Sequence, residues 1–562
     1  MSKINQHADF IWSIAELLRG DYKQSEYGKI VLPFTILRRL DCVLEPTKQK
    51  VLNSLPKVEH MKLENVDPVL NKVAGRNFHN RSKFTFKKLI ADSDHISDNL
   101  MDFINGFSKD AREIIDYFHF TEQINRLDEA NLLFMIVQRF AEVDLHPDKV
   151  SNIEMGYIFE ELIRKFADAS NETAGEHFTP REVIRLMVNI LFLNDRDILT
   201  TKGITKTLYD PACGTGGMLS IAEEYLRELN PDARLEVFGQ EINPESYAIC
   251  KSDMLIKGQN ASNIKFGNSF TQDGLAEEKF DYMLSNPPFG VEWKKIQKEI
   301  NDEFEDKGFN GRFGPGLPRI SDGALLFLLH MVSKIKSANG GTRLGIVFNG
   351  SPLFSGGAGS GESEIRKWII EHDLLEAIIA MPDQLFYNTG ISTYVWIVTN
   401  RKKSKRKGKI QLVNAVDFFQ KMRKSLGNKR HEISPEHIEQ ITKIYGEFEE
   451  GEFCKIFDNK EFGYNRITVE RPLEKGKKKA NPELRDFENI PLKEDIHAYF
   501  KREVLPHVPD AWIDESKTKV GYEINFTRYF YKYKPLRSLD EIKKDILALE
   551  EETKDMIQEV IE

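Results

Sequence analysis

Cysteine is scarce in this sequence of 562 residues: there are four, and no two of them form a CxxC pair. Scattered cysteines argue against a disulfide framework and a zinc site, so we expect no metal and a reducing, cytoplasmic compartment. The N-terminus lacks the apolar stretch of a signal peptide, and no apolar run is long enough to span a membrane. We therefore expect a soluble protein without membrane contact.

Basic residues are outnumbered by acidic ones, 79 against 88, and the formal net charge is −9. Non-specific binding to nucleic acid depends on Lys and Arg neutralising phosphates, so this balance disfavours a protein that binds DNA unaided. A basic face can still coexist with acidic helices elsewhere. If DNA is the substrate, we expect a partner chain to carry much of the contact.

The N-terminal part of the chain is patterned as helices. Apolar residues recur at helical spacing at 10–18, 31–40, 132–140 and 153–163, with no strand-like run between them. Such stripes are ordinarily buried as core. We therefore predict an all-α N-terminal domain over residues 1–165.

Beyond residue 180 short apolar strands alternate with helices, which predicts a parallel sheet with helices on both faces. Strands are expected at 207–209, 235–240, 264–267, 282–284, 344–348 and 375–380, and helices at 217–229, 244–256, 323–335 and 362–371. A last strand, 393–399, follows 375–380 after a loop too short for a crossover helix. These two strands should therefore pair antiparallel.

We place this α/β unit at 166–410, and two further segments follow it. The basic run 401–407 closes the unit and is expected to be a solvated loop or, more specifically, a phosphate-contacting turn. Residues 411–537 are mixed and rich in Lys and Glu; their pattern assigns no fold, and we treat them as an extension of the unit. In 538–562 apolar residues at helical spacing among charges predict an amphipathic tail helix that needs a partner surface.

A glycine-rich turn joins the first expected strand to the helix after it: Asp210-Pro211-Ala212-Cys213-Gly214-Thr215-Gly216-Gly217. Glycines let a backbone turn tightly beside a ligand, and a helix N-terminus attracts electronegative groups. No Gly-Lys-Ser/Thr follows, which excludes a P-loop, and the spacing departs from the dinucleotide pattern GxGxxG. On its own, a glycine-rich turn more often only connects two secondary-structure elements and binds no ligand.

Glu241 ends the second expected strand. A carboxylate there, about 20 residues beyond the glycines, can accept hydrogen bonds from a ribose diol. A solvated strand end or a helix cap would also explain a single glutamate. Taken with the glycine turn, Glu241 indicates a nucleoside-cofactor site.

Asn286-Pro287-Pro288-Phe289 follows the fourth expected strand, at the edge where doubly wound folds bind ligands. A stiff turn would by itself explain the prolines. The exocyclic amine of adenine is a poor nucleophile, because its lone pair is delocalised into the ring. Acceptors for its two N–H groups would restore nucleophilicity, and we predict them to be the Asn286 side-chain oxygen and the Pro287 carbonyl. Phe289 offers a flat face for an extruded base.

Together these residues resemble the S-adenosylmethionine-dependent amino-methyltransferases that act on DNA. The resemblance implies a class I methyltransferase fold: an α/β, Rossmann-like sheet, here with an all-α N-terminal domain and a C-terminal helical tail. In that family the glycine turn and the acidic strand end hold the cofactor, S-adenosyl-L-methionine. The residues assigned to it in this way are Asp210, Gly214, Thr215, Gly216, Gly217 and Glu241.

The resemblance assigns two further elements to the cofactor. An upstream loop, Glu176-His177-Phe178-Thr179, would line its methionine end, although N-capping by Thr179 also explains that position. The family often has an acidic residue at the end of the third strand, to accept from the cofactor's adenine. Here Asn268 stands there, and its side-chain oxygen would accept instead.

The order of these elements resembles that of the γ-type adenine-N6 methyltransferases. Further segments are similar to the modification subunits of type I restriction–modification systems, over nearly the whole chain: 31–34, 176–181, 322–325, 388–391 and 521–524. The resemblance implies a site-specific DNA methyltransferase that acts on adenine N6 of a flipped-out base in double-stranded DNA. It also implies a specificity subunit, a second copy of this chain and a restriction/motor subunit that joins them.

Two alternatives stay open at this stage. The same Asn-Pro-Pro-aromatic turn serves enzymes that methylate amino groups in RNA or a protein glutamine, against which the helical N-terminal domain and the tail argue. The other is a non-catalytic DNA-binding scaffold, against which the presence of Asp210, Glu241 and Asn286 argues.

Three more residues near these motifs have simpler expected roles. Asp322 should cap the helix that follows it. His330 should be packing, because methyl transfer needs no histidine base. Phe386 is equally consistent with stacking on the target base opposite Phe289 and with packing.

Overall fold

The computed structural model describes residues 3–170, 179–337, 340–387, 389–474, 479–531 and 538–561. The chain forms two compact units, Met1–Ile524 and Asn525–Glu562. The first unit contains the helical N-terminal part and two β-sheets of four or more strands. The second contains α21 (Phe526–Phe530) and α22 (Leu539–Ile561).

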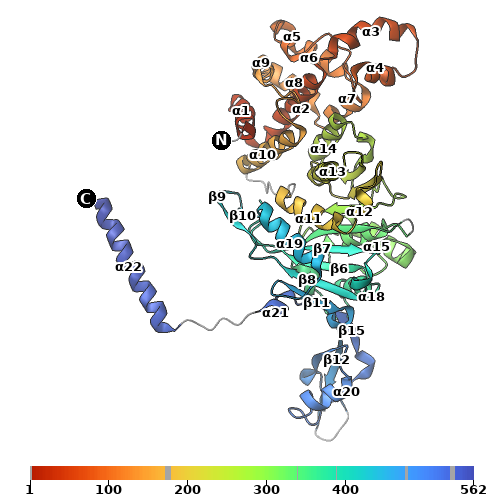
Figure 1. Ribbon diagram of the computed structural model, residues 1–562, viewed down its shortest axis with the longest axis vertical. Coiled ribbons are helices and arrows are strands. Elements are labelled where there is room, and N and C mark those ends of the chain that lie inside the picture. The colour runs from red at the N-terminus through yellow and green to blue at the C-terminus, as the bar shows by residue number, and fades with distance from the viewer. Residues whose placement is uncertain are drawn as a thin grey trace. The chain divides into compact units, whose positions relative to one another are not determined.

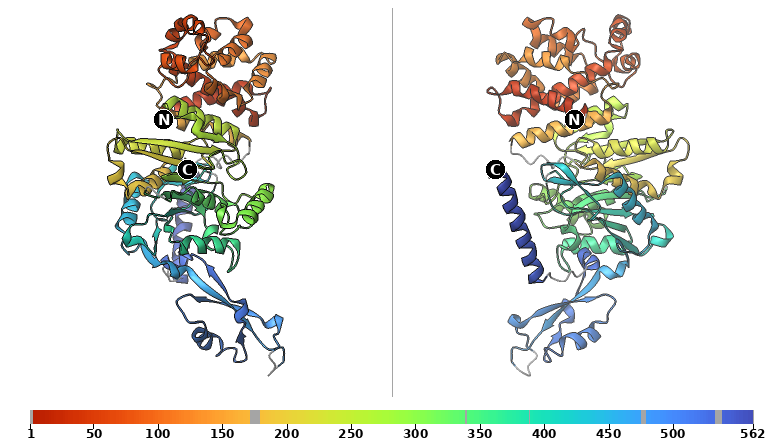
Figure 2. Two further views of the ribbon diagram at one scale, coloured as in Figure 1. Left: turned by 90° about the vertical axis from the view of Figure 1, so that its right-hand side faces the viewer. Right: turned by 60° about the vertical axis from the view of Figure 1, so that its left-hand side comes forward.

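The N-terminal part is all-α, as predicted, and no strand lies among its described residues (Figures 1 and 2). Helix α2 is its centre, because nearly every residue of that helix is buried. Phe34 stacks on Phe140 at 5.2 Å and meets Phe120 edge-on at 4.8 Å. The helices are α1 (Lys3–Ala15), α2 (Gly28–Leu44), α3 (Lys48–His60), α4 (Asp67–Ala74), α5 (Phe86–Leu89), α6 (Ile96–Asn105), α7 (Lys109–Asp116), α8 (Phe120–Glu129), α9 (Leu133–Glu142) and α10 (Asn152–Ser170).

The main sheet has nine strands in the order β11-β8-β6-β7-β5-β4-β1-β2-β3. Strand β7 lies antiparallel between β5 and β6, which confirms the predicted antiparallel pair. The sheet then continues where the pattern assigned no fold, with β8 parallel to β6 and β11 antiparallel to β8. The strands are β1 (Thr205–Asp210), β2 (Arg234–Glu241), β3 (Ile264–Phe266), β4 (Tyr282–Ser285), β5 (Arg343–Asn349), β6 (Leu375–Ala380), β7 (Thr393–Thr399), β8 (Lys409–Asn414) and β11 (Cys454–Asp458).

Helices cover both faces of this sheet, because successive strand residues point to opposite sides. On one face Tyr282 of β4 packs against Phe192 of α11, with ring centroids 4.7 Å apart. On the other, the Tyr209 hydroxyl of β1 lies 3.0 Å from Nε2 of His330 in α16. The helices of this region are α11 (Arg181–Leu193), α12 (Arg196–Leu199), α13 (Gly217–Leu229), α14 (Pro244–Lys257), α15 (Gln297–Lys307), α16 (Ala324–Ser333), α17 (Ser351–Phe354), α18 (Gly361–Glu371) and α19 (Pro435–Glu447).

Strand β1 pairs in parallel with both β2 and β4, so the strand order reverses beside it. In doubly wound sheets a ligand binds in the crevice at the carboxyl ends of the strands at such a reversal. The fold thus brings the ends of β1, β2 and β4 to one edge, although they are far apart in the sequence.

Two smaller sheets follow in the chain. Strands β9 (Gln420–Leu426) and β10 (Lys429–Glu432) form a two-stranded ribbon. Strands β12 (Gly463–Glu470), β13 (Asp486–Pro491), β14 (Trp512–Ile513) and β15 (Lys519–Tyr522), with α20 (Ile496–Tyr499), form a four-stranded sheet with its own small core. Arg366 of α18 donates to the Tyr522 carbonyl at 2.6 Å and so ties this sheet to the larger one.

The basic run 401–407 is a solvated loop only in part. Lys402 is buried and donates to Asp373 at 2.6 Å, and Arg406 is fully buried and donates to Gln411 at 2.7 Å. These cations hold the end of the sheet together, because each one has a polar partner inside the fold. The side chains of the run that remain exposed are Lys403, Lys405 and Lys407.

Helix α22 leaves an apolar row uncovered: Leu539, Ile542, Ile546, Leu547 and Leu549 are all exposed. Among the helices that the structure describes, none is both long and apolar enough to cross a membrane. The helical spacing of the row is that of an amphipathic helix.

Candidate active site

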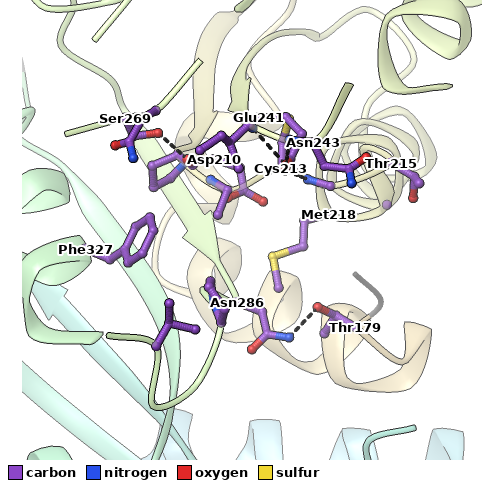
Figure 3. A pocket seen from close by; sticks show the side chains of 18 of the residues that line it. Thr179, Asp210, Cys213, Thr215, Met218, Glu241, Asn243, Ser269, Asn286 and Phe327 are labelled. Atoms are coloured by element: carbon purple, nitrogen blue, oxygen red, sulfur yellow. Dashed lines mark hydrogen bonds between the residues drawn. The ribbon is translucent and has the colours of Figure 1, made fainter. Parts of the chain in front are cut away.

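A cavity of about 260 Å³ lies at the carboxyl ends of β1 to β4 (Figure 3). Most of its lining comes from strand ends and the turns after them, which is where doubly wound sheets bind their ligands. Its walls are formed by Glu160, Thr179, Ile184, Asp210, Pro211, Ala212, Cys213, Gly214, Thr215, Gly217, Met218, Glu241, Ile242, Asn243, Gly267, Asn268, Ser269, Phe270, Asn286, Pro288, Val291 and Phe327.

The glycine turn reaches from the end of β1 to the start of α13, as its spacing indicated. Gly214 and Gly216 have φ angles of +53° and +86°, which favour glycine. A Cβ on Gly216 would also lie 2.8 Å from the Cys250 sulfur. Gly216 therefore shapes the turn without facing the cavity, whereas Gly214, Thr215 and Gly217 line it.

Glu241 lies at the end of β2 and uses its carboxylate to hold the turn. Its oxygens accept from the backbone N–H groups of Gly214 at 2.8 Å, Ile242 at 2.8 Å and Asn243 at 2.7 Å. A carboxylate has about four acceptor positions, so roughly one stays available to a ligand. The residue is thereby both a structural anchor and a hydrogen-bond acceptor in the cavity wall.

Asp210 is buried at the end of β1 and points into the same cavity (Figure 3). Its Oδ1 accepts from the Ala212 N–H at 3.0 Å and from the Ser285 hydroxyl at 2.9 Å, which links the ends of β1 and β4. Burial raises the pKa of the Asp210 carboxyl from 3.8 to about 7, against the lowering effect of those hydrogen bonds. A cation bound beside it would favour the ionised form.

Asn286 directly follows β4, and its side chain is held by Thr179 on the same side of the cavity (Figure 3). The amide Nδ2 donates to the Thr179 hydroxyl at 2.9 Å. The amide Oδ1 is buried and has no hydrogen-bond partner among the described residues. Buried acceptors are rarely left unpaired, so this oxygen is the feature of the site that most needs an explanation.

The rest of the Asn-Pro-Pro-Phe turn is divided between the cavity and the core. Pro288 lines the cavity, whereas Pro287 and Phe289 do not. Phe289 is half-buried, and its ring meets that of Phe386 edge-on with centroids 6.0 Å apart. Phe386 is almost fully buried, which favours packing over stacking on a target base.

The loop after β3 forms the far wall. Asn268 lines the cavity, and its Oδ1 accepts from the Phe270 N–H at 2.8 Å, so part of its acceptor capacity is already in use. Arg312 braces this loop by donating to the carbonyls of Ser269 at 3.0 Å and Phe270 at 2.6 Å. Sequence reasoning did not identify Arg312, because its role is to support backbone and not to touch the ligand.

Glu160 is another residue that sequence reasoning missed. It comes from α10, outside the α/β unit, and lines the cavity. Its Oε1 accepts from Arg181 at 3.1 Å, and burial raises the pKa of the carboxyl. No sequence signal marks Glu160, because it lies on an earlier helix and only the tertiary fold brings it to the cavity.

Three predicted residues of the upstream loop, Glu176, His177 and Phe178, lie outside the described residues, as does Asn388. Thr179 is described and lines the cavity.

The remaining polar residues near the site have structural roles. Asp322 accepts from the Ala324 N–H at 3.1 Å at the start of α16. His330 is fully buried between Tyr209 and Arg312, and burial holds its pKa well below the usual value. Among the described residues no group of three His, Cys, Asp or Glu side chains could hold a metal ion.

Comparison with known proteins gives two family matches. A model described as N-6 DNA Methylase matches residues 151–480, and one described as HsdM N-terminal domain matches residues 7–140. The chain is 27% identical to the type I restriction enzyme MjaIX methylase subunit of Methanocaldococcus jannaschii, over 79% of this chain and 77% of that one. It is 30% identical to the HindI methylase subunit of Haemophilus influenzae, over 46% of this chain and 54% of that one.

Solved structures share the fold. The methyltransferase subunit of a type I restriction–modification system from Streptococcus thermophilus matches with a TM-score of 0.64 at 23% identity, covering 82% of this chain and 97% of that one. This agreement confirms the class I methyltransferase fold. Since the first family model spans more than half of the sequence, the chain belongs to the N-6 DNA methylase family.

Proposed function

We propose that this chain transfers a methyl group from S-adenosylmethionine to the N6 amine of adenine in DNA, as the modification subunit of a type I restriction–modification assembly. One observation carries the proposal: the buried, unpartnered Oδ1 of Asn286 in the wall of the cavity. An acceptor without a donor is suited to a substrate that brings its own N–H groups.

The turn Asn286–Phe289, which we name the catalytic turn, acts on the adenine amine through hydrogen bonds. Asn286 Oδ1 accepts one N–H of the adenine amine, and the Pro287 carbonyl accepts the other. Both bonds draw the nitrogen toward tetrahedral geometry and localise its lone pair, which makes it a better nucleophile. Thr179 keeps the Asn286 oxygen pointed at the substrate, because it accepts from the opposite end of the amide.

The residues that line the cavity fit S-adenosylmethionine, which when bound supplies the methyl group as an electrophile. Glu241 has acceptor capacity left for the ribose hydroxyls, and Asn268 stands where the adenine amine is expected. The carboxyls of Asp210 and Glu160 are suited to the cationic methionine end. Thr179 and the glycine turn complete the set, and Glu176, His177 and Phe178 remain part of the predicted site.

The names of the relatives and the tail helix support the proposed assembly. The relatives are named as methylase subunits of type I restriction enzymes. We propose that the apolar row of α22 docks on a specificity subunit, which selects the DNA site, and that a second copy of this chain and a restriction/motor subunit join the assembly. The domain limits 1–165, 166–410, 411–537 and 538–562, and a cytoplasmic location, are part of the same proposal.

A methyl-transfer assay tests the function. The full chain, with its specificity subunit, is given S-adenosylmethionine labelled in the methyl group and offered DNA, RNA and protein. Label should appear in adenine N6 of DNA, and Asn286→Ala should lower kcat by about 10²-fold or more, the usual cost of losing one oriented group in an active site.

The control is Asn53→Ala, which removes an exposed asparagine of α3 whose side chain, among the described residues, accepts from Gln49. This variant should behave as wild type. Calorimetry should show unchanged cofactor affinity for Asn286→Ala, which excludes misfolding. Label that enters only RNA or protein would refute the function, and normal activity of Asn286→Ala would refute the mechanism.

A further inference from the structure

The ribbon of β9 and β10 is strongly basic in an acidic chain. The segment Gln420–Glu432, which we name the basic hairpin, holds five Lys and Arg residues and one Glu, a net charge of +4 where the whole chain has −9. A local field of this kind is not visible in the total charge.

Four of the five cations are free on the surface. Lys421, Arg423, Lys424 and Arg430 are all exposed, and within the described part of the chain none of them has an ion-pair or hydrogen-bond partner for its side chain. The fifth, Lys429, is buried and anchors the ribbon by donating to the Leu385 carbonyl at 3.0 Å and to the Glu182 carboxylate. One cation of the hairpin thus has a structural role, and the other four are available to bind a ligand.

The basic hairpin is attached to the loop beside the catalytic turn. The Asn428 N–H donates to the Tyr387 carbonyl at 2.9 Å, and the Arg430 N–H donates to the Gln384 carbonyl at 2.9 Å. That loop carries Phe386, whose ring contacts Phe289 of the catalytic turn. The exposed cations therefore belong to a ribbon that is bonded to the loop beside the turn that would receive a target base. Figure 1 shows β9 and β10 at the edge of the α/β part.

We propose that the basic hairpin binds the phosphate backbone of duplex DNA next to the flipped adenine. This inference rests on the proposed function, since it takes the substrate to be DNA. Phosphate contacts fix the register of a protein on DNA without reading its sequence. Four unpaired cations on a hairpin bonded to the loop beside the catalytic turn supply such contacts. In the basic run 401–407, by contrast, Lys402 and Arg406 are bonded inside the fold.

The test compares two pairs of substitutions with the same change in charge. Arg423→Gln with Lys424→Gln alters the basic hairpin, and Lys403→Gln with Lys407→Gln alters exposed lysines of the basic run. Each full-length variant, assembled with its specificity subunit, is titrated onto a labelled duplex of roughly 30 base pairs by fluorescence anisotropy, at about 50 to 200 mM KCl.

The hairpin pair should flatten the slope of log K against log salt by about 2, since each phosphate contact contributes roughly 0.9. At about 100 mM salt it should also weaken binding roughly 10-fold or more. The control pair should keep the wild-type slope. Cofactor affinity, measured by calorimetry, should be unchanged in both.

Four results would overturn the assignment. They are an unchanged slope in the hairpin pair, an equal loss in both pairs, tighter binding of RNA than of duplex DNA, and no binding of duplex by wild type at the lowest salt. If the hairpin pair loses a protein partner but keeps the wild-type slope for DNA, this counts as the first of these results. If instead wild type binds DNA through the hairpin but methylates no adenine, the proposed function fails and the DNA contact stands.

Discussion

Replacing Thr179 with valine should slow methyl transfer by more than any change in cofactor affinity explains, because the Thr179 hydroxyl fixes which end of the Asn286 amide faces the substrate. Asn286 Nδ2 donates to that hydroxyl at 2.9 Å. A net hydrogen bond of this type contributes about 1 kcal/mol, and 1.4 kcal/mol corresponds to about a factor of ten. Without it the amide can turn its NH2 group toward the adenine amine, so kcat should fall about 5-fold. Thr179→Ser keeps the hydroxyl and should stay near wild type.

A double-mutant cycle separates this orienting role from general damage. Asn286→Asp presents an oxygen in either orientation, so Thr179→Val should cost little in that background. The expected coupling is about 1 kcal/mol, within the range for residues in direct contact. Single-turnover rates on DNA for the four proteins, with cofactor affinities from calorimetry, give the cycle. An equal cost of Thr179→Val in both backgrounds, or a loss explained by cofactor affinity, would refute the orienting role.

Two further predictions concern the buried carboxyls of the cavity. Glu160→Gln should weaken S-adenosylmethionine binding about 10-fold or more, the cost of a charge-assisted hydrogen bond, but should leave the affinity for methylthioadenosine, which lacks the ammonium group, unchanged. The control Glu161→Gln changes a carboxylate that pairs with Arg164 outside the cavity. Equal weakening of both ligands by Glu160→Gln would indicate a structural role. Asp210→Asn should stabilise the cofactor-free protein at high pH. The folded carboxyl keeps its proton up to a pKa of about 7 and the unfolded one only up to about 3.8, so the stability of wild type falls between these values as pH rises. The advantage of the variant in urea unfolding should grow by about 3 kcal/mol from pH 5 to pH 8, and a constant difference would contradict it.

Much of the α/β fold could be predicted, because its strands are apolar runs bounded by clear turns. Helix α13 begins and ends at the predicted residues, and β6 and β7 match their predicted bounds. Strands β8 and β11 were not found, since their pairing joins segments that are far apart in the sequence. A short strand without a neighbouring turn signal is set by its partner and not by its own pattern.

The residues of the candidate site likewise divide into those that could be predicted from the sequence and those that could not. Residues at strand ends, such as Asp210, Glu241 and Asn286, could be placed together from the topology of a parallel sheet. Glu160 and Arg312 could not, because Glu160 comes from an earlier helix and Arg312 acts through backbone carbonyls. The buried cations of the basic run show the opposite error, in which local charge suggests solvent exposure until tertiary partners are known.

The unpaired oxygen of Asn286 has a consequence for stability as well as for catalysis. A buried acceptor without a donor costs about 1 to 3 kcal/mol, and packing alone would favour a residue without that cost. The surrounding fold instead maintains the acceptor: Thr179 fixes the amide, Ser285 ties the end of β4 to Asp210, and the turn is stiffened by its prolines. An adenine amine that donates to this oxygen would recover the lost hydrogen bond. The unpaired oxygen therefore favours binding of the flipped base and also activates its amine.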